Sequence, residues 1–191
     1  NYGVNSQLSF TKGTASLHYS HDKTKRTFNS RYGTNTFNGA FNHAEVFMNY
    51  DLGRHLQLLP GIAFQQLQLE DEKAEIKNPS LSITSPYVSF FIKDISGFSI
   101  ELGSRYVNHS VYGNTFTCSA NPSWLIHKRV KLFANYSTGF KAPTLSQLYG
   151  QFGANENLRP EESKNFEGGA QFFSAANTLN FRATAFSRKL N

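Results

Sequence analysis

Apolar and polar residues alternate with a period of two along most of the chain. In five segments the apolar side chains occupy one parity and mostly polar side chains occupy the other. The apolar sets are Ala44, Val46, Met48, Tyr50 and Leu52; Phe98, Ile100, Leu102 and Tyr106; Phe116, Cys118, Ala120, Trp124 and Ile126; Val130, Leu132, Ala134, Tyr136 and Phe140; and Leu179, Phe181, Ala183 and Ala185. Successive side chains of a strand point to opposite faces, whereas a helix would distribute them around its axis. The pattern therefore predicts β-strands with one apolar face.

The predicted strands are long, and their connections alternate between short and long. Many strands run about 10 to 13 residues, and about 9 to 11 residues are enough to cross a bilayer. Short turns are predicted at residues 11–13, 52–55, 94–97, 127–129 and 175–177. Longer polar segments are predicted at about 21–37, 69–80 and 139–162, with a modest one near 109–114. Short turns on one side and long loops on the other are typical of outer-membrane barrels.

These features predict the fold class. We expect an all-β chain, an antiparallel up-and-down transmembrane β-barrel with about ten strands of a larger barrel. Residues 1–191 are expected to form part of one β-barrel domain. Two sites disturb the pattern: Pro60-Gly61 predicts a β-bulge, and Pro122 removes one ladder hydrogen bond.

Composition is consistent with a membrane barrel. Only 39% of the residues are hydrophobic although 15% are aromatic, as expected when each strand has one lipid-facing and one polar side. No stretch approaches the roughly 20 apolar residues of a membrane helix. No export signal is recognisable, so we expect the mature protein to begin upstream of residue 1. The single Cys118 excludes an internal disulfide.

The formal net charge of +6 raises the question of which anionic partners the chain could bind. The densest basic cluster, residues 21–26, falls in a predicted loop and lacks an aromatic-basic motif, so nucleic acid is not an expected partner. The same charges suit anionic lipopolysaccharide at the outer membrane or an anionic ligand.

A motif near the end of the chain adds a family resemblance. Residues 136–150 read YSTGFKAPTLSQLYG, residues 155–163 read NENLRPEES, and residues 166–169 read FEGG. This resembles the late-barrel signature of TonB-dependent outer-membrane receptors, in their cobalamin and siderophore branch. The matching positions are Phe140, Lys141, Ala142, Pro143, Leu148, Tyr149, Asn155, Leu158, Pro160 and Glu161.

The resemblance implies a transporter wall. Receptors of this family close about 22 strands around a plug domain. The expectation is a fragment lacking the plug and the remaining strands, from a receptor that takes up siderophore-iron or cobalamin. Its partners would be a TonB-type energy-coupling protein, acting through the missing plug, and a small-molecule nutrient complex. Haem is disfavoured, because haem receptors carry a His ligand in the corresponding segment and residues 140–158 contain none.

The segment after Phe140 has two interpretations, which are compatible. In the first it is a strand exit, where Pro143 ends the ladder and Leu145 and Leu148 pack the loop. In the second it lines a ligand vestibule, because loops on a rigid scaffold often carry binding. The vestibule residues would be Gln147, Tyr149, Gln151 and Asn155.

No catalytic residues, metal site or cofactor are predicted. The six His residues lack metal-ligand spacing and are expected at the surface or in turns. The acidic runs 70–72 and 161–162 are expected to be solvated loop charges. Two other functional classes stay open. One is a complete small outer-membrane barrel acting as an adhesin or hydrolase, and the other is a soluble all-β binding module.

Overall fold

The computed structural model describes residues 1–31, 33–71, 74–76, 78–151, 153–175 and 178–191. In this part of the chain, ten antiparallel strands and one short helix follow in order. They are β1 (Tyr2–Phe10), β2 (Gly13–Ser30), β3 (Gly33–Asp51), β4 (Leu56–Asp71), β5 (Ser80–Ile95), β6 (Phe98–His109), β7 (Gly113–Ile126), β8 (Val130–Lys141), α1 (Leu145–Tyr149), β9 (Glu161–Phe173) and β10 (Asn180–Leu190). No helix in these ranges is long and apolar enough to span a membrane.

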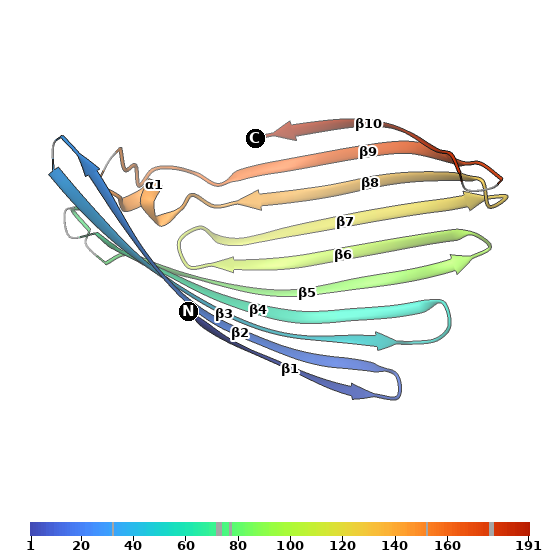
Figure 1. Ribbon diagram of the computed structural model, residues 1–191, viewed down its shortest axis with the longest axis horizontal. Coiled ribbons are helices and arrows are strands. Elements are labelled where there is room, and N and C mark those ends of the chain that lie inside the picture. Colours follow the sequence, from blue (N-terminus) through green and yellow to red (C-terminus); the bar gives the residue numbers. More distant parts are fainter. Residues whose placement is uncertain (32, 72–73, 77, 152, 176–177) are drawn as a thin grey trace.

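The strands form one sheet in the linear order β1 to β10, each paired with its neighbours in sequence (Figure 1). The prediction of about ten strands in up-and-down order is confirmed. Within the described residues β1 does not pair with β10, so the sheet has two free edges. Every residue of these two edge strands is exposed. The alternative of a complete small barrel needs that pairing and is therefore not supported.

The register brings the strand residues of all five predicted apolar sets onto the same face of the sheet, and Leu52 and Leu179 lie just outside β3 and β10. Leu102 pairs with Phe90 on one side and Ala120 on the other, and Ala120 pairs with Tyr136. Because directly paired residues of neighbouring strands share a face, the same parity can be followed from β1 to β10. We call this the outer face and the opposite one the inner face. Independent alternation in ten strands therefore produces one continuous apolar surface.

Two rows of aromatic residues bound this surface. We call the end of the sheet with the short turns the turn end, and the opposite end the loop end (Figure 1). On the outer face the row toward the loop end contains Tyr2, Tyr19, Phe64, Tyr106, Phe116, Tyr136 and Phe166. The row toward the turn end contains Phe10, Tyr50, Phe98, Trp124, Phe172 and Phe181.

The spacing of the two rows matches a bilayer. On β6, Phe98 and Tyr106 are eight residues apart, which is about 27 Å along the strand at about 3.4 Å per residue and roughly 21 Å along the barrel axis at a tilt of about 40°. Outer-membrane barrels carry an apolar band about 25 Å tall between aromatic girdles. We refer to the outer-face region between the rows as the apolar band. Its large side chains, such as Leu102 and Leu132, are exposed in the isolated sheet, as expected of a surface that faces lipid.

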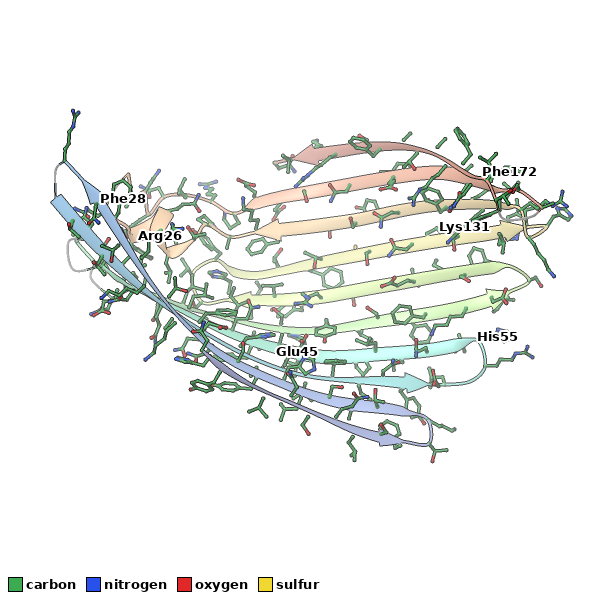
Figure 2. The ribbon with its side chains drawn as sticks, viewed as in Figure 1. Arg26, Phe28, Glu45, His55, Lys131 and Phe172 are labelled. Atoms are coloured by element: carbon green, nitrogen blue, oxygen red, sulfur yellow. The ribbon has the colours of Figure 1, made fainter. Side chains whose placement is uncertain are left out.

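The inner face is polar and carries a network of side-chain hydrogen bonds. Tyr87 donates its hydroxyl to Glu45 Oε1 at 2.8 Å, and Arg105 stacks on the Tyr87 ring at 4.7 Å. Glu45 lies near the middle of the sheet in Figure 2. Further along, Asn135 donates to Asn121, and Asn121 donates to Glu101. The well-buried strand residues also lie on this face, namely Ser16, Ala63, Asp71, Leu81, Ser85, Val107, His109 and Ser163.

The predicted loop at residues 21–37 is wrong. β2 continues to Ser30 and β3 begins at Gly33, and the ladder runs without a break through this region. The basic cluster at residues 21–26 therefore lies in β2 and not in a loop. The hairpin extends past the apolar band at the loop end (Figure 1). The outer face is polar there, with Lys23, Lys25 and Asn38, whereas the aromatic residues Phe28 and Phe37 lie on the inner face. The outer apolar alternation therefore ends although the backbone pairing persists.

The other long connections are shorter than predicted. They span residues 72–79, 110–112 and 142–160. The short connections lie at 11–12, 52–55, 96–97 and 127–129. The predicted turn at 175–177 lies largely outside the described residues. The loop end therefore differs from the turn end in three features, namely the protruding β2–β3 hairpin and the connections 72–79 and 142–160.

The predicted bulge at Pro60-Gly61 is also wrong. The β4–β5 register passes through both residues unchanged, and the irregularity lies between Ile92 and Ile95 instead. A Cβ on Gly61 would overlap the ring of Tyr87, so this glycine allows the close approach of an inner-face side chain. Pro122 behaves as predicted, because the β7–β8 ladder omits its position while the pairing with β6 continues.

Candidate functional site

The predicted vestibule segment begins with a capped helical turn. Thr144 Oγ1 accepts a hydrogen bond from the Gln147 backbone at 3.3 Å. The Gln147 side chain in turn accepts from the Thr144 backbone at 2.9 Å. This reciprocal capping box satisfies two amides that would otherwise lack partners at the start of α1. The Gln147 side chain is therefore engaged in positioning the helix.

The helix packs at the loop end against β4. Leu145 and Leu148 are buried, the latter to 1% exposure. The predicted role of both leucines in packing the loop is confirmed. Beside them the carboxylate of Asp71, at the end of β4, accepts a hydrogen bond from the Gln151 backbone at 3.2 Å. Asp71 is 2% exposed, so the prediction of a solvated charge is wrong for this residue. Its neighbour Glu70 is exposed as predicted, and residue 72 lies outside the described ranges.

The β6–β7 turn holds the far end of the same loop. Tyr112 donates its hydroxyl to the Leu158 carbonyl at 3.0 Å. Burial raises the pKa of Tyr112, and the nearby Tyr149 raises it further. His109 is 2% exposed beside Tyr112, which corrects the prediction that every His lies at the surface or in a turn. Its burial follows from its inner-face position beneath the loop.

His109 is held in one tautomer. Its Nδ1 accepts the backbone N–H of Val111 at 3.1 Å, so the proton of the neutral ring lies on Nε2. Nε2 is buried and has no partner among the described residues. His109 lies beyond the apolar band, which ends on β6 at Tyr106, and burial lowers its pKa from the usual 6.5. The Phe140 ring, predicted on the apolar face, lies 6.5 Å from the His109 ring.

A cavity of about 710 Å³ separates the two long loops. Tyr149, Gln151 and Asn155 line it, as does Glu156 from the same loop. The opposite wall is formed by Ala74, Glu75 and Ile76 of the β4–β5 loop. Three of the four predicted vestibule residues therefore meet around one cavity, whereas Gln147 lies outside its lining.

The polar groups in this cavity differ in how far they are already engaged. Gln151 Oε1 is buried without a hydrogen-bond partner among the described residues. Asn155 Oδ1 instead accepts the Asn157 backbone N–H at 2.9 Å and shapes the loop. A buried acceptor without a partner is unfavourable, and a hydrogen-bond donor on a ligand would satisfy it. Gln151 is thus the predicted residue best placed to contact a ligand.

The family-motif residues mark where the loop leaves the sheet. Lys141 and Glu161 are the last pair of the β8–β9 ladder, and their side chains form an ion pair at 3.7 Å. Both are well exposed, so the pair adds little stability. Ala142 and Pro143 follow the end of β8, and Pro160 precedes β9. The strand-exit interpretation accounts for these positions.

No arrangement for catalysis or metal binding is evident in the part of the chain that the structure describes. No group of three His, Cys, Asp or Glu residues there could hold a metal ion. Cys118 is a free thiol on the outer face, paired across the strands with Ser104.

Several residues at the site were not predicted from the sequence. Asp71 and Gln151 are 80 positions apart, and Tyr112 and Leu158 are 46 apart. No local pattern links such positions, and only the folded sheet brings them together. The sequence did hold one indication for Asp71. It is an even number of residues from Ala63 on β4, so both side chains point to the inner face.

Comparison with known proteins was consistent with this architecture. Along 119 residues the chain is 31% identical to the vitamin B12 transporter BtuB of Photobacterium profundum, covering 62% of this chain and 20% of that protein. The siderophore receptor PirA from Pseudomonas aeruginosa aligns over 99% of this chain and 38% of its own, with a TM-score of 0.84 and 23% identity. The FrpB iron transporter from Neisseria meningitidis aligns over 98% and 37%, with a TM-score of 0.76 and 14% identity.

The chain thus spans about a fifth of the curated relative and little more than a third of the similar structures. These proteins are named as transporters and a receptor. The model of the TonB dependent receptor-like β-barrel family matches residues 1–191. With ten antiparallel strands and the matching motif in place, the chain belongs to the family of TonB-dependent receptor β-barrels.

Proposed function

We propose that this chain forms part of the wall of an outer-membrane receptor that takes up siderophore-bound iron or cobalamin. The observation that carries the proposal is the outer face, where an apolar band lies between two aromatic rows about 27 Å apart along the strands. A barrel wall in a bilayer requires such a surface, and a soluble binding module would bury it.

The two ligand classes are supported by what the relatives are named for. The curated relative is a vitamin B12 transporter, and PirA is a siderophore receptor. The low identity to the solved structures supports the shared fold alone, so the choice between iron complex and cobalamin depends on experiment. In either case the nutrient is cargo that the receptor carries.

The free edges support a larger barrel. In the part of the chain that the structure describes, β1 and β10 each present an unpaired strand edge, and exposed edges of this length favour pairing with further strands. In the proposed receptor, further strands close the barrel around a plug domain, and the polar inner face lines the lumen. A TonB-type protein would supply energy through that plug.

The cavity between the two long loops is the proposed nutrient contact. Tyr149 provides an aromatic surface and Gln151 Oε1 provides a buried acceptor without a partner among the described residues. Gln147 is assigned a different role, because its side chain caps α1. Asn155 both lines the cavity and shapes the loop.

The proposal is tested with the complete receptor in a strain that lacks its own siderophore and cobalamin receptors. Uptake of radiolabelled ferric siderophores and of cobalamin is measured with and without a functional TonB system. TonB-dependent uptake of one of the two classes is expected. Uptake of neither class, or uptake that persists without TonB, would contradict the proposal.

Variants of the purified receptor then test the cavity. Gln151→Ala removes one hydrogen-bond acceptor, and we expect nutrient affinity to fall about three- to tenfold. Gln147→Glu is the matched control, since glutamate also completes a capping box and the position lies outside the cavity. Equal losses in both variants, or none in Gln151→Ala, would argue against this contact.

A further inference from the structure

The outer face is hollowed just beyond the apolar band. A cavity of about 660 Å³ lies over β2, β3, β4 and the start of β5 at the loop end. Most of the strand residues that line it have outer-face parity, including Lys23, Lys25, Asn38, Gln68 and Ser80. This hollow is separate from the cavity between the long loops, and the proposed nutrient site does not use it.

The hollow carries excess positive charge. Lys23 and Lys25 are exposed and form no ion pair within the described ranges. Glu70 is the acidic residue in the lining, and its Oε2 accepts a hydrogen bond from Asn38 Nδ2 at 2.9 Å. Two ammonium groups therefore stand beside amide and hydroxyl side chains that can bind sugar hydroxyls. This combination suits a ligand with both phosphate and sugar.

The hollow is continuous with the apolar band below it. On β2 the outer-face positions run from Lys23 through His21 to Tyr19, a member of the aromatic row. On β4 they run from Gln68 through Gln66 to Phe64. A lipid with acyl chains along the band would hold its headgroup at the level of the hollow.

The same arrangement recurs at the other side of the sheet. Lys164 and Lys189 are directly paired on the outer face of β9 and β10. Phe166 lies on the same face of β9, two residues from Lys164 toward the apolar band. Like charges in directly opposed positions are unfavourable unless an anion lies between them. Neither lysine forms an ion pair in the described part of the chain.

We propose that the outer hollow binds the phosphorylated sugar headgroup of a lipopolysaccharide-type glycolipid, with phosphate on Lys23 and Lys25 and sugar on Asn38, Gln68 and Ser80. The acyl chains lie over Tyr19 and Phe64. This inference rests on the proposed outer-membrane location and deepens it by naming a lipid and its residues. It does not depend on which nutrient is carried.

The test uses the complete receptor, purified in detergent and titrated with fluorescent bis-phosphorylated lipid A. The double variant Lys23→Gln, Lys25→Gln is compared with Arg26→Gln, which removes a cation from the inner face of the same hairpin (Figure 2). At about 1 kcal/mol per cation near an anionic surface, the double variant should bind roughly thirtyfold more weakly. Arg26→Gln should stay within about twofold, and Lys23→Arg, Lys25→Arg should keep the affinity.

The unmodified receptor provides a second measurement that does not depend on a variant folding. Dephosphorylated lipid A should bind as weakly as bis-phosphorylated lipid A binds the double variant. Equal affinity for both lipids would overturn the proposal, as would an undiminished affinity in the double variant. Equally tight binding of phosphatidylglycerol vesicles, or full competition by inorganic phosphate, would contradict the glycolipid as occupant. Nutrient uptake is recorded in parallel, because loss of lipid binding with intact uptake separates this proposal from the receptor function.

Discussion

Leu102→Arg places a charge at the middle of the apolar band. Leu102 lies on the outer face of β6, four residues from Phe98 and four from Tyr106, which belong to opposite aromatic rows. Its paired neighbours Phe90 and Ala120 are apolar, so no carboxylate lies directly across either neighbouring strand to receive the guanidinium. Leu102 is 44% exposed in the isolated sheet, and in a bilayer that exposed surface faces lipid.

The expected penalty follows from the depth of the residue. Eight residues span about 27 Å along the strand, or roughly 21 Å along the barrel axis at a tilt of about 40°. Leu102 is therefore about 10 Å from either interface. Arginine at the midplane of a barrel costs about 2–4 kcal/mol, and the cost falls to about 0–1 kcal/mol near an interface.

Asn108→Arg is the matched control. It lies on the same face of the same strand, beyond Tyr106, and pairs with Asn114. The free energy of unfolding of both variants is measured by urea titration of the complete receptor refolded into lipid vesicles. We expect Leu102→Arg to lose at least about 2 kcal/mol and Asn108→Arg to lose less than about 1 kcal/mol. Equal losses, or the larger loss in Asn108→Arg, would refute the depth assignment.

Three further outcomes are expected. Gly61→Ala should destabilise the refolded receptor by about 1–3 kcal/mol, because its Cβ overlaps the Tyr87 ring; urea titration with unchanged stability would count against this packing. Tyr112→Phe removes the hydrogen bond to Leu158, so limited proteolysis should cut the 142–160 loop faster, and an unchanged rate would contradict the contact. Burial lowers the pKa of His109, so the neutral ring stabilises the docked loop above pH 6.5. As the pH falls below 6.5 the undocked state binds the proton first, and hydrogen exchange in the loop should rise more than in a His109→Gln variant.

The sheet was predictable because its physical cause is local. A strand that separates lipid from water must alternate, and Phe98, Ile100 and Leu102 show that alternation without any knowledge of their neighbours. The five apolar sets share one face because the strands pair so that all their apolar sides lie in the same environment. The motif from Phe140 to Glu161 also identified the family, because it lies in one short stretch.

The loop predicted at residues 21–37 was wrong because the strands extend beyond the region in which the outer face is apolar. β2 and β3 continue through residues 21–37 because backbone pairing persists in water, but the outer face is polar there and its apolar alternation ends. Asp71 and His109 were misplaced for a different reason: a loop distant in sequence covers them. Gln147 was assigned to a ligand although the Thr144-Leu-Ser-Gln spacing is that of a capping box.

Lipid contact along β6 tests the central claim most directly. Spin labels are placed one at a time at residues 98–108 of the complete receptor in vesicles, and collisions with oxygen and with a water-soluble nickel chelate are measured. Even-numbered positions from 98 to 106 should favour oxygen, with the maximum at residue 102, whereas the odd-numbered positions and residue 108 should not. A profile without this two-residue period, or with the oxygen maximum on odd-numbered residues, would contradict a membrane-spanning outer face.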